Sequence, residues 1–251
     1  MLKLAEIKAK SILNKSKIFD YCLNPYTGCQ VGCRYCYAAL FMRRYSGHKE
    51  AWGDFVDVKV NAPELLQKQL VKAKTGNVWI SSVCDPYQPV EKEYGLTRKC
   101  LAVFARNNFP VTIQTKSVLV LRDLDILKDL KAVEVGFTLA TDDEKIARFF
   151  EPGAAAVAKR LDALDKLHAA GIPTFAFIGP ILPGDPQKLI ENLNGLVDRV
   201  LVDKLNYAGF LKQYYQKAGF SREWTGPFFQ EQKERLVSGL NRRKMAYEIL
   251  F

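Results

Sequence analysis

The chain has 251 residues, of which 48% are apolar and 25% charged, a composition that suits one large α/β domain better than two small ones. No apolar run approaches the length that spans a bilayer, and the N-terminus alternates lysine with apolar residues without a signal-peptide core, so we expect a cytoplasmic protein without membrane contact. A net charge of +10 favours anionic partners such as nucleic acid or nucleotides, although a solubility surplus spread over the surface explains it equally well. Three of the six cysteines are clustered too tightly to join separate elements, which excludes a disulfide framework.

Strand and helix signals alternate after a basic lead-in, residues 1–18, whose structure the sequence leaves open. Strands rich in Val, Ile and Phe are expected at residues 18–23, 55–60, 78–83, 111–115, 133–139, 174–178 and 200–202. Helices are expected at about residues 37–45, from Asn61, from Thr97, at 123–130, on both sides of Pro152-Gly153, from Asp185-Pro186 and at 227–251. Asn61 is expected to cap its helix. Val157, Leu161, Leu164 and Leu167 are expected to form the inner face of the helix that ends before Gly171.

The alternating elements repeat about every 30 residues, the size of a βαβ unit. This pattern is typical of either a βα barrel or a doubly wound sheet. Because about six or seven units are visible where a full barrel has eight, we favour an α/β fold that forms a partial (β/α)6 TIM-type barrel. We expect a single domain over residues 1–251, with a core at about 18–206 and a C-terminal helical segment at about 207–251.

Polar or proline-bearing segments follow the predicted strands. They are residues 24–38, 85–89, 116–117, 141–142, 179–184 and 203–206. Because sites in barrels and open α/β sheets lie at the carboxyl ends of the strands, we expect these loops to build a pocket around residues 24–38.

A cysteine cluster dominates residues 24–38: Cys29, Cys33 and Cys36 have three and then two residues between them. Thiolates are soft ligands that suit zinc and iron–sulfur clusters. A closed ferredoxin loop would need a fourth cysteine followed by proline, and here a tyrosine and an alanine follow the third. A structural zinc site usually needs four ligands, for which Cys22 and His48 are weak candidates. The remaining interpretation is a cluster with one open iron that binds a small molecule.

The string Gly-Cys-x3-Cys-x-Tyr-Cys-Tyr, with Asp-Pro-Tyr-Gln-Pro and Thr-Lys-Ser later, resembles the spore photoproduct lyase-like branch of the radical S-adenosylmethionine (SAM) superfamily over about residues 24–206. The resemblance implies that Cys29, Cys33 and Cys36 hold a [4Fe–4S] cluster whose open iron chelates SAM. Reduction then gives a 5′-deoxyadenosyl radical, which abstracts a hydrogen atom from the substrate. The resemblance also implies an electron donor such as ferredoxin or flavodoxin.

Several site residues follow from this resemblance. Tyr35 matches the aromatic position beside the adenine. Tyr35 and Tyr37 match tyrosines linked to hydrogen-atom relay, with packing against the cluster as the simpler role for Tyr37. Lys116 matches a lysine that contacts the SAM carboxylate, a sound role for an ammonium group. Ser117 and Thr138 are candidates for further hydroxyl contacts.

Cys84 and Asp85 follow the strand expected at residues 78–83. Cys84 is displaced from the position of the family's cysteine hydrogen donor, so it is either a catalytic hydrogen donor or a buried small apolar residue. Asp85 is a candidate contact of the substrate or SAM, or else caps its turn. The predicted function is a radical SAM enzyme with an unknown substrate, for which a nucleic acid or nucleotide is the candidate. The alternative is a non-enzymatic zinc or iron–sulfur protein that binds nucleic acid.

Overall fold

The computed structural model describes residues 2–205 and 208–251, and its chain divides into two compact units. The first unit contains Met1–Gly32 and Ala38–Val135, and the second contains Cys33–Tyr37 and Gly136–Phe251. Strand β8 (Val133–Thr138) runs from the first unit into the second. The expected single domain stays a prediction. Residue 206, at the end of the last predicted polar segment, lies outside the described residues.

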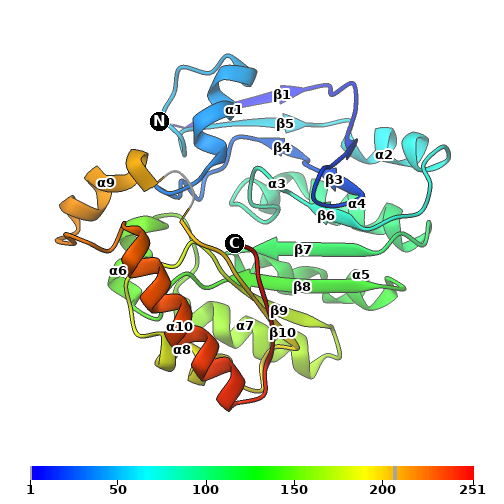
Figure 1. Ribbon diagram of the computed structural model, residues 1–251. Coiled ribbons are helices and arrows are strands. Elements are labelled where there is room, and N and C mark those ends of the chain that lie inside the picture. Colours follow the sequence, from blue (N-terminus) through cyan, green and yellow to red (C-terminus); the bar gives the residue numbers. More distant parts are fainter. Residues whose placement is uncertain (1, 206–207) are drawn as a thin grey trace. The chain divides into compact units, whose positions relative to one another are not determined.

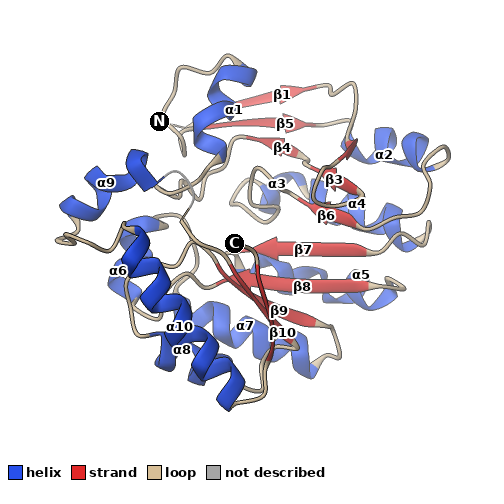
Figure 2. Ribbon diagram, viewed as in Figure 1, coloured by secondary structure: helices blue, strands red, loops and turns tan. Residues whose placement is uncertain are grey.

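The first unit contains two groups of paired strands and their helices (Figures 1 and 2). Its elements in chain order are β1 (Lys3–Ile7), β2 (Leu13–Lys15), β3 (Tyr21–Leu23), β4 (Tyr26–Thr27), α1 (Ala38–Ser46), β5 (Phe55–Lys59), α2 (Ala62–Leu70), β6 (Val78–Ile80), α3 (Glu91–Tyr94), α4 (Leu96–Ala105), β7 (Val111–Thr115), the 3-10 helix η1 (Val118–Asp123) and α5 (Leu124–Asp129). Strand β5 pairs with β1 in parallel and with β4 antiparallel. Strands β7, β6 and β3 are parallel neighbours, and β2 pairs antiparallel with β3.

The parallel strands of the first unit are covered on their faces, as their apolar composition predicts. Every residue of β6 is buried, and β7 exposes only part of Gln114. Helices α2 and α4 pack against each other and bury Leu66, Leu101 and Phe104. Polar groups are therefore presented at the ends of β6 and β7, where the predicted site residues lie.

The second unit continues the alternation of strands and helices (Figure 2). Its elements after β8 are α6 (Glu144–Phe150), α7 (Val157–Ala169), β9 (Thr174–Ile178), α8 (Pro186–Leu193), β10 (Arg199–Val202), α9 (Ala208–Lys217), α10 (Gly226–Arg242) and β11 (Ala246–Ile249). Strand β10 lies between β9 and β11 and is parallel to both. Helix α8 begins where it was predicted to start, and there the Asp185 carboxylate accepts a hydrogen bond from the Gln187 N–H at 3.0 Å; the helix packs against α10.

The predicted strands all occur, with small differences at their ends, but three local predictions are wrong. The segment 227–251 is not one helix, because α10 is followed by β11, which extends the parallel strands of the second unit. Asn61 makes no cap bond, because its side chain instead binds the backbone N–H and carbonyl of Ala9 at 2.8 and 2.9 Å. On α7, Val157, Leu164 and Leu167 are buried as predicted, but Leu161 is only half-buried and Arg160 is buried in its place.

The lead-in holds β1 and β2, which the sequence did not predict. None of the helices in the described ranges combines the length and apolar character that crossing a membrane requires.

Candidate functional site

The first part of the cysteine loop, as we call residues 24–38, is held in the first unit by close backbone packing and by the buried side-chain amide of Gln88. Gly28 has φ +86°, and a Cβ there would collide with the backbone oxygen and ring of Phe55, so the position requires glycine. The Gln88 side chain is fully buried, accepts from the Gln30 N–H at 2.8 Å and donates to the Gly28 carbonyl at 3.2 Å. Cys29 is therefore fixed between two clamped residues.

Asp85 joins Cys29 to the loop that follows β7. Its backbone N–H points at the Cys29 Sγ at 3.3 Å. Its carboxylate accepts hydrogen bonds from the Tyr87 N–H at 2.9 Å, the Thr115 hydroxyl at 2.6 Å and the Lys116 N–H at 2.7 Å. The structure therefore brings together three residues that the sequence singled out, Cys29, Asp85 and Lys116.

Ser117 continues this turn and begins the 3-10 helix η1. Its hydroxyl oxygen accepts from the Leu119 N–H at 3.3 Å, and its own N–H donates to the Thr115 hydroxyl oxygen at 3.0 Å. The Lys116 side chain is half-buried. The Lys116–Ser117 turn is thus ordered by local bonds and by Asp85.

Cys84 is half-buried and packs against a small apolar cluster that includes Tyr26, Val56 and Val58. Its thiol donates a weak hydrogen bond to the Tyr26 carbonyl at 3.6 Å. Burial, the largest influence, raises the pKa of the Cys84 thiol to about 11. The side chain therefore has the surroundings of a protonated, apolar cysteine.

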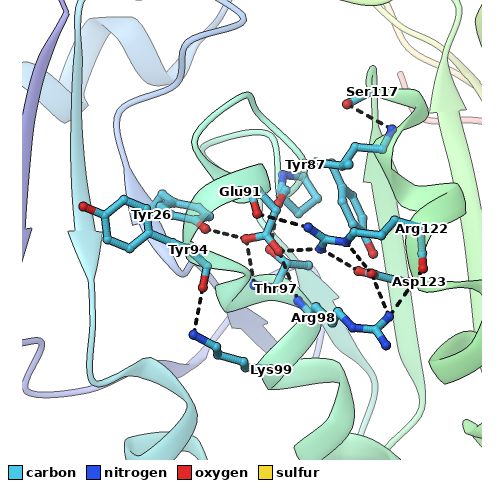
Figure 3. A network of polar contacts seen from close by, with 12 residues as sticks. Tyr26, Tyr87, Glu91, Tyr94, Thr97, Arg98, Lys99, Ser117, Arg122 and Asp123 are labelled. Carbon is cyan, nitrogen blue, oxygen red and sulfur yellow. Dashed lines mark hydrogen bonds and ion pairs between the residues drawn. The ribbon is translucent and has the colours of Figure 1, made fainter.

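A buried ionic network in the first unit joins residues of α3, α4 and η1 (Figure 3). The carboxylates of Glu91 and Asp123 are fully buried, and the Arg122 guanidinium reaches both, at 2.8 and 2.7 Å. Arg98 makes a second bond to Asp123 at 3.0 Å, and the Tyr26 hydroxyl donates to Glu91. Because both buried carboxylates are paired and hydrogen-bonded, the network connects β4, α3, α4 and η1 without leaving an isolated charge.

The second part of the cysteine loop, Cys33–Tyr37, is held in the second unit at the end of α6. The Arg34 N–H donates to the Phe150 carbonyl at 2.8 Å, and the Tyr35 hydroxyl donates to the Glu151 carboxylate. Burial first, and then the Glu151 charge, raise the pKa of Tyr35 well above its usual value. Tyr37, by contrast, is exposed.

The carboxylate that binds the Tyr35 hydroxyl belongs to a buried ion pair between Glu151 and Arg160. Glu151 and Arg160 are 2% and 1% exposed, and their charged groups lie 2.6 Å apart. The Arg160 guanidinium also donates to the carbonyls of Ala155 and Thr138, both at 2.7 Å. Within the second unit the structure thus connects two predicted site residues, Tyr35 and Thr138, through Arg160 and Glu151.

The sequence reasoning assigned no role to four supporting residues: two that stand in the quoted motifs, Gln88 and Thr115, and two that stand in none, Glu151 and Arg160. Arg160 carried a visible signal, because a basic residue stood at helical spacing between Val157 and Leu164 on an apolar face. Glu151 carried none, since it stands at an ordinary helix end.

The three cysteines supply the donor type that an iron–sulfur cluster takes, whereas the described part of the chain places no three His, Cys, Asp or Glu side chains together as a metal-binding group. None of Cys29, Cys33 and Cys36 forms a disulfide; the first two are buried and the third is half-buried. The N–H of Asp85 already points at one of these sulfurs, as the hydrogen bonds that tune cluster sulfurs do. Three soft donors in one loop are the ligand set that such a cluster takes.

Comparison with protein families identifies the class. The model of the radical SAM superfamily matches residues 23–196, so the chain belongs to this superfamily and the predicted family is confirmed. The "Uncharacterized protein MJ0683" of Methanocaldococcus jannaschii is 40% identical over 184 residues, which are 72% of this chain and 69% of that protein. The "Radical SAM Nalpha-GlyT isomerase" of Pseudomonas phage M6 is 27% identical over 193 residues, 74% of this chain and 39% of that protein. The match to the phage protein thus spans well under half of its length.

Solved structures show the fold. A spore photoproduct lyase complexed with dinucleoside spore photoproduct has a TM-score of 0.74 at 16% identity, over 99% of this chain and 82% of that chain. SuiB of Streptococcus suis bound to S-adenosylmethionine has a TM-score of 0.63 at 14% identity, over 100% of this chain and 50% of that chain. The predicted α/β fold, a partial TIM-type barrel, is confirmed by these likenesses.

Proposed function

We propose that the chain is a radical SAM enzyme that cleaves SAM reductively and uses the resulting radical on a substrate. Cys29, Cys33 and Cys36 would hold a [4Fe–4S] cluster. When bound, the cluster and SAM supply a 5′-deoxyadenosyl radical, which removes a hydrogen atom from the substrate. The reductant would be a one-electron carrier such as ferredoxin or flavodoxin.

One observation carries this proposal: within the first unit, Asp85 bonds both to the sulfur of a cluster cysteine and to the backbone of Lys116. A ligand of the cluster and the lysine expected to bind the SAM carboxylate are thereby connected through one residue. The alternative role, a solvated surface lysine, gives no reason for a bond between its backbone and a buried carboxylate. The arrangement supports a cofactor role for Lys116, with the ammonium group opposite the carboxylate.

The chain's other polar residues have supporting roles in this proposal. Ser117 and Thr138 supply hydroxyl contacts, and Tyr35 and Tyr37 are candidates for the adenine side and for hydrogen relay. Cys84 is the candidate hydrogen-atom donor, since a thiol with its pKa raised to about 11 keeps its proton at neutral pH. A donor of a hydrogen atom must be in that protonated form.

The candidate substrate is a nucleic acid or nucleotide. Two observations support this class: the net charge of +10, and the dinucleoside spore photoproduct bound in a structure of similar fold.

Anaerobic reconstitution tests the proposal. After treatment with iron and sulfide we expect about four iron atoms per chain, and release of 5′-deoxyadenosine when dithionite and SAM are added. Replacing any of Cys29, Cys33 and Cys36 by alanine should abolish both, whereas Cys22→Ala, a matched control outside the motif, should leave both unchanged. One tightly held zinc ion per chain without cleavage of SAM would instead favour the non-enzymatic alternative.

A further inference from the structure

Asp85 in the first unit links two segments whose residues the proposed function uses. It follows β6, and it bonds to residues of two other segments, the cysteine loop and the turn after β7. We infer that Asp85 is a positioning residue, which sets Cys29 and the Lys116–Ser117 turn in one geometry and does not itself contact the cofactor. This inference rests on the proposed function of those residues.

Both carboxylate oxygens of Asp85 accept hydrogen bonds from groups of the protein. The side chain is nearly buried, at 8% exposure, and three donors point at its two oxygens. Oδ1 accepts from the Tyr87 N–H and the Thr115 hydroxyl, and Oδ2 accepts from the Lys116 N–H. A buried carboxylate needs such donors to offset its desolvation, so the bonds hold the group in place.

Thr115 connects the Asp85 carboxylate to the backbone of Ser117. Its hydroxyl donates to Asp85 at 2.6 Å and accepts from the Ser117 N–H at 3.0 Å. Both residues expected to contact SAM after β7 thus have their backbone N–H groups oriented by Asp85, one directly and one through a single hydroxyl. The direction in which the Lys116 side chain leaves the backbone is fixed by the same bonds.

The backbone N–H of Asp85 contacts the cysteine loop. Its N–H lies 3.3 Å from the Cys29 Sγ, and the neighbouring Gln88 holds the residues on either side of that cysteine. A hydrogen-bond donor at sulfur restricts the orientation of the cysteine side chain, as groups around a metal ligand do. The side chain and backbone of Asp85 therefore couple a cluster ligand to the SAM-binding turn.

Two substitutions separate positioning from direct contact. Asp85→Asn removes the charge, and Thr115→Val removes only the relay hydroxyl, at a residue that is itself 2% exposed. If Asp85 acts by positioning, both variants should bind SAM about tenfold more weakly, measured from the SAM-dependent change in the electron paramagnetic resonance spectrum of the reduced cluster. Thr115→Ser, which keeps the hydroxyl, is the matched control and should stay within about twofold of the wild type.

A loss of SAM binding in Asp85→Asn with wild-type binding in Thr115→Val would show that Asp85 touches the cofactor, and would overturn the inference. Wild-type binding in both variants would overturn it as well. Should Thr115→Val fail to fold, as judged by circular dichroism, Thr115→Ala takes its place.

A second measurement on the metal-free chain separates this inference from the proposed function. The rate at which iodoacetamide alkylates Cys29, followed by peptide mass spectrometry with Cys22 as internal reference, should change by about threefold or more in Asp85→Asn and Thr115→Val, and not in Thr115→Ser. Unchanged rates in all variants would contradict the coupling. If the wild type neither binds nor cleaves SAM, the proposed function fails, and the alkylation rates still decide whether Asp85 orders Cys29.

Discussion

At the scale of single residues, Lys116 and Cys84 are the side chains whose surroundings bear most directly on the chemistry. Lys116 has a backbone fixed by Asp85 and a half-buried side chain. Cys84 stands directly before Asp85 in the chain, yet its thiol faces the Tyr26 carbonyl and an apolar cluster. Neighbours in the sequence therefore have different environments, which can be measured separately.

Lys116→Met should weaken SAM binding by about 10- to 100-fold, because a charge-assisted bond to the cofactor carboxylate would be lost. Equilibrium binding of SAM to the reconstituted protein measures the effect. Lys116→Arg should bind better than Lys116→Met, since it keeps the charge. Lys128→Met, at an exposed lysine in the last turn of α5, is the matched control and should bind as the wild type does. Equal affinity for all variants would remove Lys116 from the site.

The Cys84 thiol should react slowly and in a strongly pH-dependent way. With a pKa of about 11 in the folded chain, its thiolate fraction at pH 8 is about two hundred times smaller than that of an ordinary cysteine of pKa about 8.5. Its alkylation, followed by mass spectrometry, should be slower by about this factor than in the urea-unfolded chain, and should rise about tenfold per pH unit toward pH 11. Equal rates in the folded and unfolded chains at pH 8 would contradict the raised pKa of the Cys84 thiol.

The same shift has a consequence for stability. Because the folded pKa lies above the unfolded one, the contribution of Cys84 to the free energy of unfolding is complete below about pH 8.5 and is lost as the pH rises toward 11. Replacing Cys84 by alanine should therefore reduce the loss of stability between pH 8.5 and 11.

At the scale of elements, the apolar face of α7 contains a charge. Arg160 is buried beside Val157, Leu164 and Leu167, and it pairs with Glu151 at the end of α6. A guanidinium in this position is tolerated because its donors bond to one carboxylate and two carbonyls. Through Glu151 the pair reaches Tyr35, so α6 and α7 order the second part of the cysteine loop.

Breaking this pair from one side should be costly. Arg160→Met or Glu151→Gln should lower the free energy of unfolding by about 3–5 kcal/mol, because a buried polar or charged partner loses its bonds. Combining the two substitutions should recover part of the loss. Denaturant unfolding of the metal-free chain measures these values.

An exposed ion pair on the same helix provides the control. Lys166 and Asp162 lie 2.7 Å apart, with more than half of each side chain exposed. Lys166→Met should therefore change stability by less than about 1 kcal/mol. Comparable effects for Lys166→Met and Arg160→Met would contradict the structural role of the buried pair.

At the scale of the whole molecule, the charge of +10 predicts how a nucleic-acid substrate would bind. If two or three phosphates are neutralised, the affinity for a single-stranded oligonucleotide should fall about tenfold between 50 and 200 mM salt. Fluorescence anisotropy with a labelled oligonucleotide measures this, and an oligonucleotide with an uncharged backbone is the control. Absence of binding at low salt would remove nucleic acid as the candidate substrate.

The sequence was sufficient for the order and type of most elements and for the family. The strands at β7 and β9 have the predicted ends, since Val-, Ile- and Phe-rich runs bounded by turns identify buried strands locally. It was insufficient for β11, whose half-exposed residues carry no such run, and which becomes a strand because it pairs with β10. The sequence also predicted the wrong role for Asn61, because its side chain binds the backbone of Ala9, 52 residues away, and is then not available to cap its own helix.

By itself the sequence determined which residues are the predicted cluster ligands, because Cys29, Cys33 and Cys36 lie within one short loop and their spacing is a local property of the chain. Only the tertiary structure decided which polar groups support these residues. Asp85 meets Thr115 across 30 residues, and Tyr35 meets Glu151 across 116. Such partners are chosen when packing removes water from both groups, since a buried polar group must then find its hydrogen bond within the protein wherever the fold supplies one.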